Sequence, residues 1–259
     1  MAELLGTVRR AMRVLDYLAE REEPVPIKQL AAELGLNISS AYHLINTLAV
    51  DGYVMRDDRS GAFGLGAKTA RLGDAYTRSW PVGPELRALV GSLGAETGEN
   101  AYLAMVQRDD VVITDIAESR QRVRVHALHR GYSADLHARA LGKAVLAYRE
   151  APAVREHFAA HPPRRITQRT LVTMTAIETD LERVRRRGYA EDLEEFCEGV
   201  CCLGAAFFTS DGKPAGSLSV SVPSFRYRTV RGAVRDAVTA AARNATAVLD
   251  TVRRRSSLG

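Results

Sequence analysis

A helix, a turn and a second helix are predicted between Pro26 and Val54, and this pattern restricts the fold more than any other feature. The apolar residues of the first helix recur with the 3.6-residue period of an α-helix, and Gly35 is placed to end it. Asn37 is a favoured N-cap for the second helix. Two helices joined by a short turn with a glycine form a helix-turn-helix, whose second helix enters the major groove of DNA.

The second helix, expected over Ser39–Val50, has two different faces. Its apolar side is expected to pack inward and carries Ala41, Leu44, Ile45 and Leu48. The candidate DNA contacts are its polar residues and one lysine of the preceding helix: Lys28, Ser39, Ser40, Tyr42, His43, Asn46 and Thr47. No acidic residue lies between Glu33 and Asp51, so the second helix carries no side chain that phosphates would repel.

A short hairpin is predicted after this helix. Its strands are expected at Tyr53–Met55 and Ala62–Leu65, because both are short apolar runs on either side of a turn-rich tip. The hairpin converts the motif into a winged helix-turn-helix. Arg56 and Arg59 at its tip are candidate contacts for phosphates or the minor groove, and the alternative is a solvated loop.

Helices are also predicted on both sides of this motif. The helix over residues 7–20 has an apolar stripe that is expected to face the core: Val8, Ala11, Met12, Leu15, Leu18 and Ala19. A linker helix follows the wing, and the prolines between Trp80 and Pro84 end it because proline lacks an N–H donor. We therefore expect a winged helix-turn-helix DNA-binding domain at residues 1–66, a linker helix at 67–80 and a second domain at 81–259.

The second domain reads as an α+β fold with a mostly antiparallel sheet. Strands are expected at Ala101–Val106, Val111–Ile116, Arg122–His126, Gly199–Phe208 and Ala215–Val222. Helices are expected at Glu85–Thr97, Ala140–Arg149, residues 152–160, Thr175–Arg187 and Val230–Arg253. Thr175 and Glu178 have the spacing of a capping box at the start of one of these helices.

Charge and composition exclude several classes of protein. The net charge is +5, but residues 1–78 hold ten basic and ten acidic side chains, so DNA binding is argued from placement and not from bulk charge. No run of about 18 apolar residues predicts a membrane span, and the N-terminus lacks a signal-peptide pattern. Three cysteines do not form a disulfide framework. We expect a reduced, cytoplasmic protein without a membrane partner.

The carboxylates that follow Gly188 could carry chemistry. Asp192 and Glu195 could act as a general acid and base, but no nucleophile or metal motif accompanies them. Asp192 could instead accept a hydroxyl or amine of a ligand, while Glu195 serves as a cap or an ion-pair partner. The cysteines at 197, 201 and 202 lack zinc-site spacing and are expected to be small buried apolar residues. We predict no catalytic residue, no metal and no cofactor.

A row of serines alternates with apolar residues near the end of the second domain. Ser217, Ser219 and Ser221 fall at period two, so their hydroxyls share one face of a strand. That face is turned either to solvent or to a pocket, and the pattern leaves both open.

The order of the elements and their local strings resemble the IclR family of bacterial transcription regulators over essentially the whole chain. The N-terminal strings that match are Leu30-Ala31, Leu34-Gly35-Leu36, Ser39-Ser40-Ala41 and Gly52-Tyr53-Val54. The C-terminal strings are Leu136-His137-Ala138, Gly142-Lys143-Ala144, Gly188-Tyr189-Ala190, Asp192, Glu194-Glu195, Gly199-Val200, Cys202 and Ser219-Val220-Ser221. Winged helices are common, so the combination of both groups carries the resemblance.

The resemblance implies a C-terminal effector-binding domain related to GAF-type sensors, which binds a small organic acid or a similar metabolite. It implies that the effector pocket is formed by Ala140, Leu141, Asp192, Cys202, Ser219 and Ser221. It also implies a homodimer or tetramer on double-stranded operator DNA, dimerised through the DNA-binding domain and linker helix. The alternatives are a small-molecule enzyme, or a redox or metal sensor, that carries a helix-turn-helix module.

The DNA-reading helix departs from the family pattern at two positions. The family usually has an arginine where this chain has His43, preceded by a histidine where this chain has Tyr42. An arginine contacts guanine with two hydrogen bonds, and a neutral histidine cannot do so. The bidentate contact with guanine is therefore not expected at position 43.

Overall fold

The computed structural model describes residues 4–21, 23–79, 83–119 and 128–256. The chain divides into two compact units, Met1–Pro81 and Val82–Gly259. The strand expected at Arg122–His126 lies outside the described residues, as does Trp80 at the expected break. Within the described ranges, every helix is too short or too polar to cross a bilayer.

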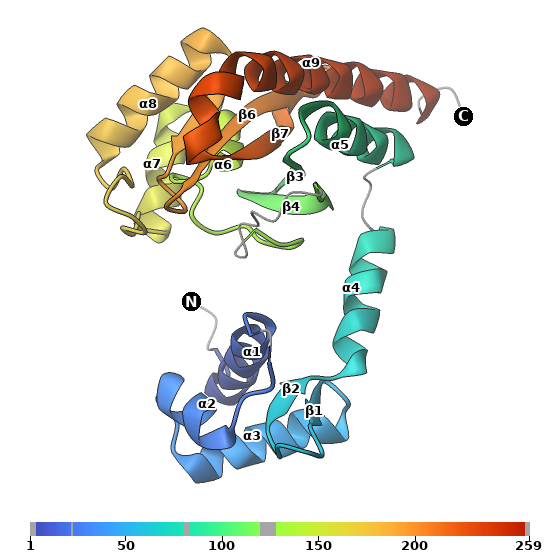
Figure 1. The fold of residues 1–259 in the computed structure, drawn as a ribbon, viewed down its shortest axis with the longest axis vertical. Helices are drawn as coiled ribbons and strands as arrows, with labels where there is room; N and C mark the ends of the chain where they lie inside the picture. Colours follow the sequence, from blue (N-terminus) through green and yellow to red (C-terminus); the bar gives the residue numbers. More distant parts are fainter. Residues whose placement is uncertain (1–3, 22, 80–82, 120–127, 257–259) are drawn as a thin grey trace. The chain divides into compact units, whose positions relative to one another are not determined.

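The first unit contains the predicted winged helix-turn-helix (Figure 1). Its elements are α1 (Gly6–Ala19), α2 (Ile27–Glu33), α3 (Ile38–Val50), β1 (Val54–Arg56), β2 (Phe63–Leu65) and α4 (Ala67–Ser79). The two strands pair antiparallel, with Val54 opposite Leu65 and Arg56 opposite Phe63. The wing therefore follows α3 directly, as the sequence predicted.

Local signals fix the turn between α2 and α3. Gly35 has a φ of +65°, the left-handed conformation that glycine adopts without a steric penalty. The side chain of Asn37 accepts a hydrogen bond of 2.7 Å from the backbone N–H of Ser40, which confirms Asn37 as the N-cap. The helices then pack on one core that includes Val14, Leu18, Leu30, Ala41, Ile45, Leu48, Val54 and Phe63.

The expected core face of α1 was right only in part: Leu18 is buried and Ala11 and Leu15 pack against the core, but the rest of the stripe does not. Val14, Tyr17 and Leu18 are the buried residues of this helix, whereas Val8, Met12 and Ala19 are exposed. The reason is that α1 meets α3 and β2 through the side that carries the buried residues, and that side is rotated from the apolar stripe. An apolar surface on α1 consequently remains uncovered within the first unit.

The second unit is built on a five-stranded antiparallel sheet in the order β4-β3-β7-β6-β5, which confirms the predicted α+β class. The strands are β3 (Asn100–Gln107), β4 (Asp110–Ala117), β5 (Ala190–Leu193), β6 (Val200–Phe208) and β7 (Pro214–Pro223). The helices are α5 (Pro84–Thr97), α6 (Ala140–Leu146), α7 (Ala151–Ala160), α8 (Met174–Arg187) and α9 (Ser224–Ser256).

Three local expectations needed correction. β5 was missed because it has four residues of mixed polarity. The final helix begins at Ser224 and not at Val230, because the chain leaves β7 directly into α9. The N-cap of α8 is Thr173, which accepts a hydrogen bond of 3.3 Å from the N–H of Ala176, so the capping box at Thr175 does not form.

Helices cover both faces of the sheet (Figure 1). α5 and α9 pack on one face, and α6 packs on the other with α8 behind it. Glycines allow α6 to approach closely, because a Cβ on Gly204 of β6 would lie 2.9 Å from the carbonyl oxygen of Ala140. A Cβ on Gly142 of α6 would overlap the backbone of Leu136. All seven residues of α6 are buried as a result.

Replacing Gly142 with alanine tests this close approach. The added methyl group would force the backbone of Leu136 aside, and we expect Gly142→Ala to lower the free energy of unfolding by at least about 2 kcal/mol. Gly91, in an exposed position of α5 with open space around it, is the matched control. Gly91→Ala should raise the free energy of unfolding by about 0.5–1 kcal/mol. Urea denaturation of both variants measures the free energy of unfolding. Equal changes in the two variants would contradict the close packing of α6 at Gly142.

Candidate functional site

The exposed face of α3 is the candidate DNA-binding surface. Ala41, Leu44, Ile45 and Leu48 are buried, and they hold the helix on the core of the first unit. The predicted contacts Ser39, Tyr42, His43, Asn46 and Thr47 are exposed, and Ser40 is half-buried. Lys28 is exposed on α2. The two faces of the helix therefore separate as the sequence pattern predicted.

Two of these polar groups already have intramolecular partners. The hydroxyl of Thr47 donates to the backbone carbonyl of His43 at 2.8 Å, and the N–H of Ser40 is held by Asn37. Tyr42, His43 and Asn46 occupy the exposed side without such constraints in the described contacts, so they are the side chains most free to reach a base edge.

The wing tip combines two exposed arginines with an organised turn. Asp57 accepts hydrogen bonds from the N–H and the hydroxyl of Ser60, both at 2.7 Å, and from the N–H of Arg59 at 3.2 Å. The hydrogen bonds from Ser60 hold the pKa of Asp57 below its usual value. Arg56 donates through Nε to the carbonyl of Gly61 at 3.3 Å. The turn thus fixes the backbone positions of Arg56 and Arg59.

The predicted effector residues of the second unit meet on one face of the sheet. Asp192 of β5 lies opposite Cys202 of β6, and Cys202 lies opposite Ser221 of β7. Asn100 of β3 lies opposite Ser221 and completes what we term the polar row, formed by Asp192, Cys202, Ser221 and Asn100. Ser219 lies opposite Gly204, against which the carbonyl of Ala140 packs. These side chains therefore face α6.

All members of the polar row are buried. The thiol of Cys202 and the hydroxyl of Ser221 are 3.2 Å apart. The hydroxyl of Ser217 donates to the carbonyl of Leu141 at 2.9 Å, which ties β7 to α6. The serine face is thus covered and not turned to solvent, and Ala140 and Leu141 lie directly above it.

Burial changes the acidity of this row. Removal from water raises the pKa of Asp192 to about 7, although Lys143 opposes the shift. Its Oδ1 accepts hydrogen bonds from the N–H groups of Glu195 at 2.7 Å and Phe196 at 3.2 Å. Burial also raises the pKa of the Cys202 thiol well above its usual value. A carboxyl that ionises near neutral pH can accept or donate a hydrogen bond to a bound molecule.

The sequence analysis did not identify the buried charged residues next to this row. Lys143 of α6 is buried, and its Nζ is 2.7 Å from Glu195 and 2.9 Å from Asp180 of α8. Burial alone lowers the pKa of Lys143, but the two carboxylates outweigh it and the pKa is raised. Glu195 is therefore an ion-pair partner. Arg139, which precedes α6, is buried as well. The sequence signal that could have revealed them is the i, i+4 spacing of Arg139 and Lys143 on an otherwise apolar helix.

The alternative chemistries receive no support from this geometry. The carboxylate of Glu195 pairs with Lys143, and that of Asp192 accepts backbone N–H groups. Among the described residues, no group of three or more His, Cys, Asp or Glu side chains is arranged to hold a metal ion. The cysteines are free thiols; Cys201 and Cys202 are buried, as expected, and Cys197 is half-buried.

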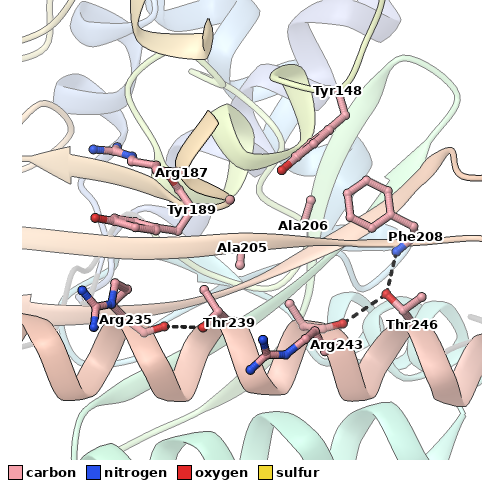
Figure 2. Close-up of a pocket in the computed structure, with 12 residues that line it drawn as sticks. Tyr148, Arg187, Tyr189, Ala205, Ala206, Phe208, Arg235, Thr239, Arg243 and Thr246 are labelled. Atoms are coloured by element: carbon pink, nitrogen blue, oxygen red, sulfur yellow. Dashed lines mark hydrogen bonds between the residues drawn. The ribbon is translucent and has the colours of Figure 1, made fainter. Parts of the chain in front are cut away.

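A separate groove of about 500 Å³ lies where β6 runs beyond β5. Figure 2 shows β6 between Tyr148 and Tyr189 on one side and α9 on the other. Arg187, Arg235 and Arg243 line it; Arg187 is paired with Glu191 at 2.6 Å and Arg235 with Asp236 at 2.8 Å. It shares no residue with the polar row. The sequence analysis did not predict a role for these arginines, because they lie on polar helix faces that are expected to contact solvent.

The raised pKa of Asp192 predicts a pH-dependent effect of Asp192→Asn. The carboxyl ionises near 3.8 when unfolded and near 7 when folded. The folded state therefore keeps the proton between these values, and this stabilising contribution is complete below pH about 4 and lost as pH rises through about 7. Asparagine keeps the Oδ1 acceptor without the charge. From pH 4 to 8 the variant should gain on the order of 4 kcal/mol of unfolding free energy relative to the wild type.

Urea titrations of both proteins across this pH range measure the gain. Asp211→Asn, at an exposed hairpin carboxyl whose pKa is lowered mainly by a hydrogen bond from Thr209, is the matched control and should show no such gain. A constant difference between wild type and Asp192→Asn at every pH would show that Asp192 is not destabilised by burial.

Comparison with known proteins agrees with both parts of the chain. Residues 75–247 match the family described as bacterial transcriptional regulator IclR C-terminal, and residues 7–58 match the IclR helix-turn-helix domain. A crystal structure of an IclR transcriptional regulator from a Silicibacter species superposes with a TM-score of 0.70 at 27% identity. The superposition covers 94% of this chain and 96% of the other.

Characterised relatives extend over most of the chain. The HTH-type transcriptional regulator BhcR of Paracoccus denitrificans is 32% identical over 246 residues, which are 93% of this chain and 88% of that protein. The transcriptional repressor IclR of Escherichia coli is 28% identical over 222 residues, covering 85% and 81%. These names agree with the expectation that the chain is not an enzyme. Since the C-terminal match alone spans more than half of it, the chain belongs to the IclR family of bacterial DNA-binding transcriptional regulators.

Proposed function

We propose that this protein binds operator DNA through α3 and the wing, and that a small organic acid bound at the polar row controls this binding. The observation that carries the proposal is the division of α3 into a buried apolar face and an exposed polar face. The family adds the expectation that such a helix lies in the major groove. The buried polar row under α6 supports the second half of the proposal, because buried polar groups on one face suit a small polar ligand.

The DNA contacts divide by task. Tyr42, His43 and Asn46 are the proposed base-reading residues, since asparagine pairs with adenine and a histidine can form one hydrogen bond with a base. The proposed phosphate contacts are Lys28, Arg56 and Arg59. The helix is also proposed to contact the DNA backbone through Ser39, Ser40 and Thr47. Phosphate contacts hold the protein on any DNA sequence, whereas base contacts select the operator.

The effector is proposed to act by shifting a population. Asp192, Cys202, Ser219 and Ser221 would bind it, with Ala140 and Leu141 above. A ligand alters DNA affinity only if it binds more tightly to one arrangement of the protein than to the other. By the same coupling, operator DNA must change the affinity for the effector by an equal factor. Control of transcription then follows from the concentration of the acid.

We further propose that the protein acts as a homo-oligomer. Val8 and Met12 on α1 are 50% and 51% exposed, and Leu72 on α4 is 54% exposed. These apolar side chains leave the first unit with surface that a second copy can cover. A two-fold dimer would place two reading helices on one operator, which predicts near-palindromic half-sites separated by a whole number of DNA turns.

Replacement of Tyr42, His43 and Asn46 together by alanine tests the reading helix. We expect the variant to lose preference for the operator over unrelated DNA while it keeps weak, salt-sensitive binding. The matched variant Arg56→Ala with Arg59→Ala should weaken binding to both DNAs alike and reduce its salt dependence. Fluorescence anisotropy at several salt concentrations separates the two effects. Retained operator selectivity in the triple variant would show that another element reads the bases.

Substitution of Met12 by glutamate tests the self-association surface. A charge at the centre of an apolar contact should raise the dimer dissociation constant at least tenfold. This corresponds to a loss of about 1.4 kcal/mol of association free energy. Val50→Glu, at a position that is 89% exposed at the end of α3, is the control and should leave association unchanged. Sedimentation velocity at several concentrations measures both. If Met12→Glu associates as strongly as the wild type, the contact lies elsewhere.

A further inference from the structure

Arg139 is a buried cation for which the described residues provide no ion pair. Its side chain is 2% exposed, and among the described residues no acceptor bonds its Nε or Nη1. Its one hydrogen bond runs from Nη2 to the carbonyl of Val111 at 3.4 Å. The Cζ atom lies 4.9 Å from the centre of the Tyr132 ring, a cation–π contact that offers no acceptor. A buried guanidinium normally has its donors paired, because burial of an unpaired charge is costly.

Two neighbouring acids, Asp135 and Glu195, are engaged with other cations, whereas Asp110 and Asp192 attract Arg139 without an ion pair among the described residues. Lys143, one turn further along the chain, has both Glu195 and Asp180. Asp135 accepts from Arg164 at 2.8 and 2.6 Å and from the hydroxyl of Tyr132 at 2.7 Å. The fold thus neutralises one buried cation with two carboxylates and leaves the other with none. Burial lowers the pKa of Arg139 to about 10, so the group stays charged at neutral pH.

Arg139 is the N-cap residue of α6, and contacts connect it to the polar row. It directly precedes Ala140, whose carbonyl packs on Gly204. The ring of Tyr132, which stacks on the guanidinium, meets Phe196 edge-to-face at 5.8 Å. The N–H of Phe196 donates to Asp192 at 3.2 Å. Asp192 also attracts Arg139 electrostatically without forming an ion pair with it. A chain of contacts therefore links the guanidinium to the row.

We propose that Arg139 is an anion subsite that binds the carboxylate of the effector, while the polar row binds an uncharged hydroxyl or carbonyl group of the same molecule. The proposal rests on the effector site argued above and adds the orientation of the ligand within it. The planar fork of a guanidinium matches a carboxylate through two parallel hydrogen bonds. The unpaired Nε and Nη1 are the donors available for that pair.

The surroundings select a single negative charge. Tyr132 and the carbonyl of Val111, which are the described contacts of the guanidinium, offer no second cation to a phosphate dianion. Asp192 of the polar row would repel the extra charge. A monocarboxylate neutralises Arg139 and leaves no excess. The effector class is therefore a small monocarboxylic acid that also carries a hydroxyl or oxo group.

The first arm of the test needs no ligand. If Arg139 is uncompensated, Arg139→Met, which fills a similar volume without a charge, should raise the melting temperature of the ligand-free protein by about 5 °C. Arg130→Met removes an exposed arginine that pairs with Asp115 and is the matched control. It should change the melting temperature by no more than about 1 °C, as exposed pairs do. A lower melting temperature for Arg139→Met would show that the guanidinium is a structural element and overturn the proposal.

The second arm uses pairs of acids and amides. Pyruvate, lactate, benzoate and 4-hydroxybenzoate, each with its amide, are compared by thermal shift on wild type, Arg139→Met and Arg130→Met. A binding acid should stabilise wild type and Arg130→Met in a concentration-dependent way. Arg139→Met should bind the acid at least tenfold more weakly than the wild type. It should also bind the acid and its amide equally well. Undiminished acid binding by Arg139→Met would overturn the subsite.

Two further outcomes are informative. Chloride or phosphate that protects the wild type as well as the acids do would overturn the assignment to carboxylates. If no acid of the panel stabilises the wild type, the organic-acid effector of the proposed function loses its support for these acids. The ligand-free arm still decides whether Arg139 is an uncompensated cation. Failure of the subsite and failure of the effector proposal are in this way distinguished.

Discussion

The buried ion pairs of Lys143 determine how the second unit is assembled. One ammonium group joins α6 to α8 through Asp180 and to the segment after β5 through Glu195. Removal of Lys143 would leave two carboxylates in the core without their cation, which is far more costly than the loss of an apolar contact. The position of α6 on the sheet depends on this network. Ala140, Leu141 and Arg139 are therefore placed over the serine face by an ion-pair network that also contacts the polar row, since the N–H of Glu195 donates to Asp192.

Much of the first unit could be predicted because its signals are local. The period of the apolar residues, the glycine turn and the Asn37 cap all act within a few residues, and each formed as expected. The core face of α1 was not local, since the positions of α3 and β2 decide which side of α1 is buried. The cap at Thr173 shows the same limit on a smaller scale: two threonines two residues apart offer similar caps, and the helix used the first.

The sequence grouped the residues proposed for the effector site, but it did not indicate their environment. Alternation along β7 indicated that the serine hydroxyls share a face, but whether that face is covered depends on Leu141, to which Ser217 is bonded across 76 residues of chain. β5 was too short to be recognised, although it supplies Asp192. Arg139 and Lys143 would be assigned to the surface by residue type. Only the tertiary packing shows that one is paired and the other is not.

The short length of β5 has a consequence for assembly of the sheet itself. β5 pairs with β6 only from Cys201 to Gly204, so in the described part of the chain no strand covers the outer side of β6 beyond it. Open strand edges recruit other chains and start aggregation. Here the N–H of Phe208 donates to the hydroxyl of Thr246 at 3.1 Å, and three arginines line the approach. A second copy would bring the same positive charges, so the sheet ends within one molecule.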